Sequence, residues 1–182
     1  MNKVKRNRLI PLAIVLVFAA PMLIAVLLNY SGWQPGASRN HGILVQPPLD
    51  IAAAPVTLAS GARLDWRDPQ WHWNLVALPN GACAEACQAQ LAAVLRMRLT
   101  LGRNAERLHL LYLGPALDAA TLQRFVPLQA GSDDAAAFAA YRPAQRGTVA
   151  LALINPNGLL ILRFDAGFDV AQVREDLVKV VH

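Results

Sequence analysis

The longest hydrophobic segment of the chain is an uncharged run of twenty residues, Leu9–Leu28. A helix rises 1.5 Å per residue, so a segment of this length spans the roughly 30 Å hydrocarbon core of a bilayer. The pattern predicts a transmembrane helix at residues 9–28 behind a short basic tail, residues 1–8. A cleaved signal peptide is the alternative, but its apolar region is usually only about 7 to 15 residues, and no convincing A-x-A site follows Leu28.

The flanks of this run predict its orientation. Basic residues stand before it, and the next one after it is Arg39; those in front are Lys3, Lys5, Arg6 and Arg8. By the positive-inside rule, the N-terminus lies in the cytoplasm and the rest of the chain outside, which in a bacterium means the inner membrane and the periplasm. Tyr30 and Trp33 fit an interfacial aromatic belt.

Residues 29–57 are rich in Gly, Pro and small side chains, which indicates a linker with short extended pieces. Beyond it, residues 58–182 alternate between strand-like and helix-like periodicity. Strand signals occur at residues 58–66 (a hairpin with Gly61 inside), 73–78, 108–113, 148–154 and 159–164. The last two strands flank Asn155–Gly158, a strong turn signal.

Helical periodicity begins at Cys83 and ends near Gly102. Short helices opened by acidic residues are predicted at 118–125 and 133–141. A terminal amphipathic helix begins with Asp169 and Gln172 placed as a capping box. Strands alternating with helices before a closing hairpin imply an α/β domain, a mixed sheet with helices on both faces.

Composition narrows the class of protein. Hydrophobic residues make up 55% and charged residues 16% of the 182 residues, which excludes a disordered chain. Four of the five net positive charges lie in the first eight positions, because 13 basic residues face 12 acidic ones from residue 30 onward. No cationic stripe is left for phosphates, so a nucleic-acid partner is not expected.

The candidate chemistry lies in Cys83-Ala84-Glu85-Ala86-Cys87, at the junction of a predicted strand and helix. Free amides and the helix dipole favour thiolate at such a position. A spacing of four places the Cα atoms near 6 Å apart, within disulfide range, and we expect a disulfide in an oxidising compartment. A dithiol that holds Cu(I), and a permanent structural bridge, remain the alternatives.

Three segments carry a resemblance to the Sco (SenC) family, membrane-anchored copper proteins of cytochrome oxidase assembly. They are HGILVQPPLDI at 41–51, WNLVALPNGACAEACQAQL at 73–91 and ALINPNGLLILRF at 152–164, in the family's order. The chain also resembles small membrane proteins associated with bacterial oxidase assembly. The resemblance implies a thioredoxin-like fold and copper as cofactor, with Cys83 and Cys87 as the sulfur ligands.

The chain departs from that family at the third ligand. The family places a histidine nine residues before the Pro of the strand-turn motif, which is Gly147 here. Glu85 stands where the family commonly has Asp, and no Pro precedes Thr148, where thioredoxin enzymes place a cis-proline. The usual Cys2His site is therefore incomplete.

Other residues are weaker candidates for that ligand. His109 is expected to be a core residue with one hydrogen bond, and His72 to face the surface of the sheet. His41 in the linker and the terminal His182 have no defined geometry, while Met97 is roughly 15 Å along the helix from Cys87.

Other kinds of site are less favoured. Ser60-Gly61 lacks a nucleophile-elbow pattern. Asp133-Asp134 is interpreted as a helix start rather than a catalytic pair. Three tryptophans are interpreted as packing residues rather than a binding surface: Trp66, Trp71 and Trp73.

These observations lead to one functional hypothesis with two alternatives. The first is a membrane-anchored Sco-like accessory factor in cytochrome c oxidase biogenesis that handles Cu(I) or thiol redox through Cys83 and Cys87, with oxidase subunits or copper chaperones as partners. The second is a periplasmic thiol-disulfide reductase with Cys83 attacking and Cys87 resolving. The third is a non-catalytic assembly protein stapled by its disulfide.

Overall fold

The computed structural model describes the backbone of residues 3–31 and 40–181, and the side chains of the first helix from Ile14 onward. The chain divides into two compact units, Met1–Arg39 and Asn40–His182. Trp33, His182 and the side chains of the basic tail lie outside the described residues, as does the first part of the predicted linker after Ser31.

The first unit contains helix α1, Lys3–Tyr30, which covers the predicted segment 9–28. The side chains described in this helix are almost all apolar, and most of them are exposed. Over residues 3–31 and 40–181, no helix is both long enough and apolar enough to cross a membrane.

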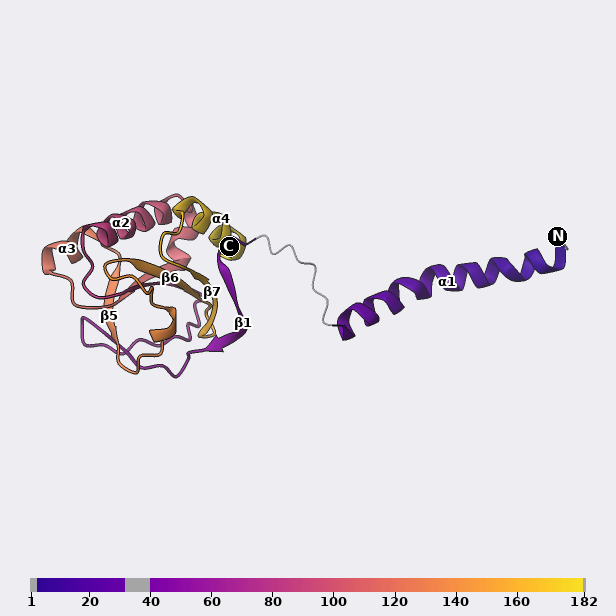
Figure 1. Cartoon of the computed structure of the whole chain (residues 1–182), viewed down its shortest axis with the longest axis horizontal. Coiled ribbons are helices and arrows are strands. Elements are labelled where there is room, and N and C mark those ends of the chain that lie inside the picture. The colour runs from indigo at the N-terminus through magenta and orange to yellow at the C-terminus, as the bar shows by residue number, and fades with distance from the viewer. Residues whose placement is uncertain (1–2, 32–39, 182) are drawn as a thin grey trace. The chain divides into compact units, whose positions relative to one another are not determined.

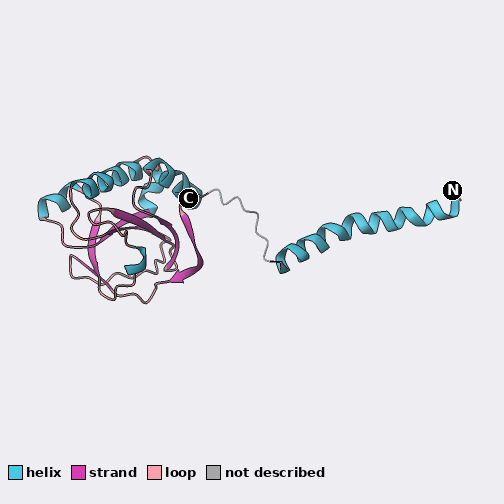
Figure 2. Cartoon of the chain, in the orientation of Figure 1, coloured by secondary structure: helices cyan, strands magenta, loops and turns pink. Residues whose placement is uncertain are grey.

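The described part of the second unit is built on one seven-stranded mixed sheet (Figures 1 and 2). Its strand order is β1-β7-β6-β3-β4-β5-β2; β3, β4 and β5 run parallel, and the other pairs are antiparallel. The strands are β1 Ile43–Asp50, β2 Val56–Leu58, β3 Trp73–Pro79, β4 Leu108–Leu113, β5 Gln129–Asp133, β6 Val149–Ile154 and β7 Leu159–Phe164. The central strands are apolar because both of their faces are covered.

The α-helices of this unit lie together on one side of the sheet (Figure 1). They are α2 Glu85–Leu99, α3 Ala119–Arg124 and α4 Val170–Val180, and the 3-10 turn η1 Gly102–Arg107 follows α2. Leu91 of α2 and Leu177 of α4 are buried in one hydrophobic cluster with sheet residues such as Leu110. The period of three or four residues places these side chains on one face of each helix, and burial of that face holds the helices on the sheet.

The opposite face of the sheet is covered mainly by loops. Trp66 and Phe138 are fully buried there, with ring centroids 5.6 Å apart, and the Trp66 indole donates to the carbonyl of Ala54 at 2.9 Å. The 3-10 turn η2, Ala139–Tyr141, is the short helical element on this side. The mixed sheet with helices agrees with the sequence prediction, but the long helices occupy one face only.

The segment predicted as a short helix at 133–141 folds differently. Asp133 is the last residue of β5, a parallel strand next to β4, rather than a helix start. Its carboxylate accepts hydrogen bonds from the amides of Ala137 and Phe138, and Ala136 has a positive φ of 52°. Side-chain capping and a left-handed residue replace the continuous α-helix in this segment.

The region interpreted as a linker contributes structure to the sheet. Residues 43–50 form edge strand β1, paired with β7. Its start is fixed by α4, because the backbone amides of His41 and Gly42 donate to Asp176 Oδ2 at 2.7 and 2.8 Å. Burial raises the pKa of Asp176, but the Lys179 ammonium and these amides outweigh burial and hold the pKa below its usual value.

A candidate dithiol site at the end of a central strand

A tight turn connects the end of strand β3 to the segment that contains the two cysteines. Gly81 has φ +77°, a conformation that suits glycine. The side-chain amide of Asn80 donates to the carbonyls of Pro143 and Ala144, at 2.9 and 3.0 Å. Its backbone amide donates to the carbonyl of Thr148 at 3.1 Å. The loop that precedes β6 is therefore fastened beside this turn.

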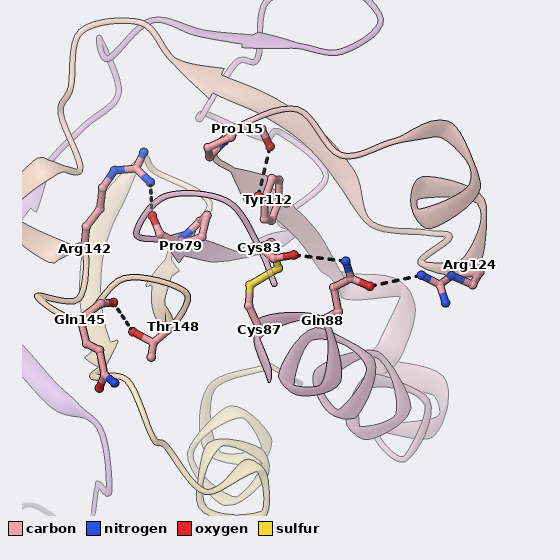
Figure 3. The surroundings of a disulfide bond; sticks show 10 residues. All are labelled: Pro79, Cys83, Cys87, Gln88, Tyr112, Pro115, Arg124, Arg142, Gln145 and Thr148. Atoms are coloured by element: carbon pink, nitrogen blue, oxygen red, sulfur yellow. Dashed lines mark hydrogen bonds between the residues drawn. A yellow bond between two sulfur atoms is a disulfide. The ribbon is translucent and has the colours of Figure 1, made fainter. Parts of the chain in front are cut away.

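Cys83 and Cys87 form a disulfide across the start of α2 (Figure 3), as expected from their spacing. Their Cα atoms are 5.2 Å apart. Cys83 retains 8% of its surface exposed, whereas Cys87 is fully buried in the core cluster of α2 and the sheet. Both cysteines are therefore buried, and Cys83 is the more exposed of the two.

Polar groups on α2 and α3 lie beside the bridge (Figure 3). Gln88 donates from Nε2 to the carbonyl of Cys83 at 3.1 Å, and its Oε1 accepts from Arg124 at 3.2 Å. The N-cap residue Ala84 supplies no side-chain cap. The N-terminal amides of α2 thus receive no side-chain cap from Ala84.

Tyr112 and Arg142 lie near the turn (Figure 3). Tyr112 of β4 is fully buried, and its hydroxyl donates to the carbonyl of Pro115 at 3.1 Å. Burial raises the pKa of Tyr112 to about 12, so the phenol is neutral at physiological pH. Arg142 donates to the carbonyl of Pro79 (Figure 3) and to the carbonyl of Leu113, each at 2.8 Å, and so links the ends of β3 and β4.

Gly147 lies next to the turn that leads to the cysteines. Its amide donates to the carbonyl of Asn80 at 2.9 Å, three residues before Cys83. A Cβ atom at Gly147 would meet nothing within 4 Å, but the residue has φ +76°. The position has room for a side chain in a left-handed backbone conformation and, being glycine, provides no metal ligand.

The described histidines have other surroundings. His41 Nε2 lies 2.9 Å from Glu175 of α4. His72 and His109 stack with ring centroids 4.4 Å apart, at the start of β3 and in β4, and His72 Nδ1 lies 2.6 Å from Asp68 Oδ2.

The burial and hydrogen bonding of His109 differ from the sequence expectation. His109 is half-buried but stacks on a second imidazole, and among the described residues no hydrogen bond reaches its ring. The expectation of a core histidine with one hydrogen bond is therefore wrong. Burial is the first cause that lowers the pKa of His109, and the neighbouring His72 adds to it.

Asp68 was not singled out from the sequence. Burial raises its pKa, but hydrogen bonds from the Gln70 amide and from His72 outweigh burial and lower it. The available signal was the spacing of four between Asp68 and His72. Asn80 and Arg142 were also missed, because their partners are backbone carbonyls from distant segments.

The remaining candidates do not form a common site. Trp66 lies in the core on the loop-covered face, Trp73 packs against the helix-covered face, and Trp71 is exposed. Met97 is buried within α2. Asp134 accepts from the hydroxyls of Thr57 and Ser132 rather than pairing with Asp133, and Ser60 is an exposed turn residue.

Comparison with known proteins places this geometry in context. Residues 73–182 match the family model described as "Transmembrane-like, thioredoxin-like, C-terminal domain". No curated protein matches the chain.

Solved structures resemble the fold at low sequence identity. Yeast Sco1 aligns with a TM-score of 0.54 and 14% identity, covering 70% of this chain and 91% of its own. Arabidopsis thaliana ScoI with copper bound aligns with a TM-score of 0.52 and 12% identity, covering 69% and 94%. Xanthomonas campestris peroxiredoxin Q aligns with a TM-score of 0.48 and 12% identity, covering 71% and 90%. The likeness to the two Sco structures shows a thioredoxin-like fold.

Proposed function

This chain belongs to the transmembrane-like, thioredoxin-like C-terminal domain family, and we propose that it is a membrane-anchored, Sco-like accessory factor in cytochrome c oxidase biogenesis that works through Cys83 and Cys87. The fold likeness to yeast Sco1 and to copper-bound Arabidopsis ScoI supports the proposal. So does the position of the cysteine pair, between the end of β3 and the first turn of α2.

The unequal burial of the two sulfur-bearing residues carries the proposal. Cys83 keeps 8% of its surface exposed, and Cys87 is fully enclosed. In dithiol exchange, one cysteine attacks the partner disulfide and the other resolves the mixed disulfide. The more exposed Cys83 suits the first role, and the enclosed Cys87 suits the second. A bridge that only stapled the turn would not require this asymmetry.

The exchange reaction follows from that arrangement. In the reduced state, the Cys83 thiolate attacks a partner disulfide, forms a mixed disulfide and releases one partner thiolate. The Cys87 thiolate then attacks Cys83 Sγ and releases the second partner thiolate. The partner gains two electrons and this chain becomes the disulfide. An exported dithiol reductant must return the pair to the reduced state.

Copper enters as cargo of the reduced pair. Two thiolates suit Cu(I), a soft ion. Position 147 supplies no imidazole, so this chain offers two thiolate ligands, and an outside ligand can add a third. Copper held in this way is expected to be exchangeable, which suits delivery to an oxidase subunit or receipt from a copper chaperone.

The anchoring part of the proposal rests on the uncharged sequence 9–28 and its basic flank. A reporter that is active only in the periplasm, fused after residue 182, should give signal. A silent fusion together with an active cytoplasmic reporter at the same position would contradict the proposed topology.

A structural bridge is the competing function, and the nearly complete burial of the disulfide favours it. The two functions differ in reduction potential. The full chain in detergent micelles, equilibrated with glutathione or dithiothreitol buffers, should show a potential of about −120 to −270 mV if the pair exchanges. A value below about −300 mV would support the structural bridge.

Anaerobic Cu(I) titration of the same reduced sample tests the cargo. One ion per chain should bind, and Cys83→Ser and Cys87→Ser should each abolish tight binding. Met97→Leu is the matched control, because its sulfur is buried within α2 and should not contribute. Unchanged uptake in both serine variants would refute the copper role.

A further inference from the structure

A second cluster of metal-binding side chains lies at the other end of β3 from the disulfide. His72 immediately precedes β3, and His109 is aligned with Asn74 on the neighbouring strand β4. The cysteines follow the far end of β3. Seven strand residues at about 3.3 Å each place roughly 20 Å between the two ends. The cluster is therefore separate from the proposed dithiol site.

The three members converge. Asp68, His72 and His109 each offer one ligand atom, and these atoms all lie within 4.8 Å of one another. His72 Nδ1 lies 2.6 Å from Asp68 Oδ2, which is a hydrogen-bond distance, so this bond must open and its proton must leave before both atoms bind one ion. All three residues are half-buried, so solvent retains access to the cluster.

The loop that carries two of the ligands is held in place by its backbone. The Asp68 amide donates to the carbonyl of Pro156 at 3.0 Å, and the carbonyl of Asp68 accepts from Trp71 at 3.1 Å. Asp68 Oδ1 is occupied by the Gln70 amide at 2.7 Å, which leaves Oδ2 directed to His72. The turn between β6 and β7 thus holds the backbone of Asp68, and the Gln70 amide orients its carboxylate. Metal-binding carboxylates are commonly oriented by such hydrogen bonds.

We propose that Asp68, His72 and His109 bind one divalent transition-metal ion, Cu²⁺ or Zn²⁺, independently of Cys83 and Cys87. Two imidazoles and one carboxylate suit these borderline ions, whereas Mg²⁺ and Ca²⁺ prefer oxygen ligands alone. Three protein ligands leave a coordination position open to water. By the Irving–Williams order, the site should bind Cu²⁺ more tightly than Zn²⁺.

Binding requires a local rearrangement. The two rings stack with 22° between their planes, so their in-plane lone pairs run side by side rather than toward one point. Rotation about the side-chain torsions must part the rings before both nitrogens reach one ion. The metal therefore replaces the ring stacking.

Isothermal titration of the oxidised full chain, untagged and in detergent, tests the site. The disulfide keeps the sulfur ligands out of the measurement. Zn²⁺ and Cu²⁺ should each bind at one ion per chain, and Cu²⁺ should displace Zn²⁺. His72→Ala, His109→Ala and Asp68→Asn should each weaken binding at least about tenfold, while Mg²⁺ should not bind.

His41→Ala is the matched control, because that imidazole is paired with Glu175 on α4 and its loss should leave the affinity unchanged. The electron paramagnetic resonance spectrum of the Cu²⁺ complex should show coupling to two imidazole nitrogens, and to one in His72→Ala. Since His109 is in a central strand, circular dichroism must show that its variant is folded; His72→Ala and Asp68→Asn, in the loop, keep the test decisive if it is not. Undiminished binding in those two loop variants, or no binding by the parent chain, would overturn the proposal.

Discussion

Reduction of the Cys83–Cys87 disulfide should lower the free energy of unfolding by about 2 kcal/mol. The bridge closes a loop of only five residues, counting both cysteines. In the chain-entropy treatment, the stabilisation grows with the logarithm of loop length, and a loop this short gives about 2 kcal/mol at 25 °C, compared with about 3 for fifteen residues.

The reduced domain should remain folded. Cys87 lies in the same core cluster as Leu91 and Tyr112, and a buried thiol behaves as a small apolar side chain there. A loss of about 2 kcal/mol is small beside the 5 to 15 kcal/mol that ordinary domains have. Both redox states would then be available to a partner, as the proposed dithiol cycle requires.

Urea unfolding followed by tryptophan fluorescence measures this loss. Trp66 is completely buried beside Phe138 and should report exposure of the core. The full chain in detergent is unfolded with and without a phosphine reductant, and the Cys83→Ala/Cys87→Ala variant is the control whose midpoint should not respond to reductant.

Two results would refute the reasoning. An unchanged midpoint on reduction would mean that the bridge does not constrain the unfolded chain. A loss above about 4 kcal/mol would mean that the bridge holds native packing together beyond its loop entropy, and that result would favour the structural role over the exchange cycle.

Three further outcomes are expected. Asp176→Asn should lower the free energy of unfolding by about 2 kcal/mol at pH 7. Its depressed pKa stabilises the fold above the unfolded value near 4, so the gap from the parent should shrink as pH falls from there through the folded pKa. Gly147→His should tighten Cu(I) binding while destabilising the fold by about 1 kcal/mol, because φ is +76° but space is open. Trp66→Ala should cost about 3 to 5 kcal/mol, since it empties the core beside Phe138.

Each of these has a direct readout. Urea titrations between pH 3 and 7 test Asp176, where a pH-independent gap from the parent would contradict the assigned hydrogen bonds. A competition assay with a Cu(I) chelator tests Gly147, where unchanged affinity would mean that the loop does not reach the thiolates. Thermal unfolding tests Trp66, where a loss below about 1 kcal/mol would mean that the loop-covered face contributes little.

Local patterns determined most of the secondary structure from the sequence alone. The apolar strand 108–113, the turn at Asn155–Gly158 and the helix stripe beginning at Cys83 all carry their period and their end signals within a few residues. The cysteine spacing likewise made the disulfide predictable, because the distance across one helical turn follows from helix geometry.

Tertiary structure decided what depended on partners distant in sequence. Residues 43–50 contain two prolines and little periodicity, yet they become a strand because β7 offers an edge and Asp176 accepts the amides before it. Asp133 resembles a helix start, but its pairing with Val56 of β2 makes it the end of β5. No local signal encodes such pairings, because their stabilisation comes from burial against another element.

For the same reason, the sequence predicts the cysteine site but not the cluster of Asp68, His72 and His109. Cys83 and Cys87 are four residues apart at the start of one helix, so local backbone geometry alone brings them together. His109 meets His72 and Asp68 only because β3 and β4 lie parallel in register, 37 positions apart in the chain between the two histidines. Spacing along a chain can specify a site within one helical turn, whereas a site across two strands exists only once the sheet has formed.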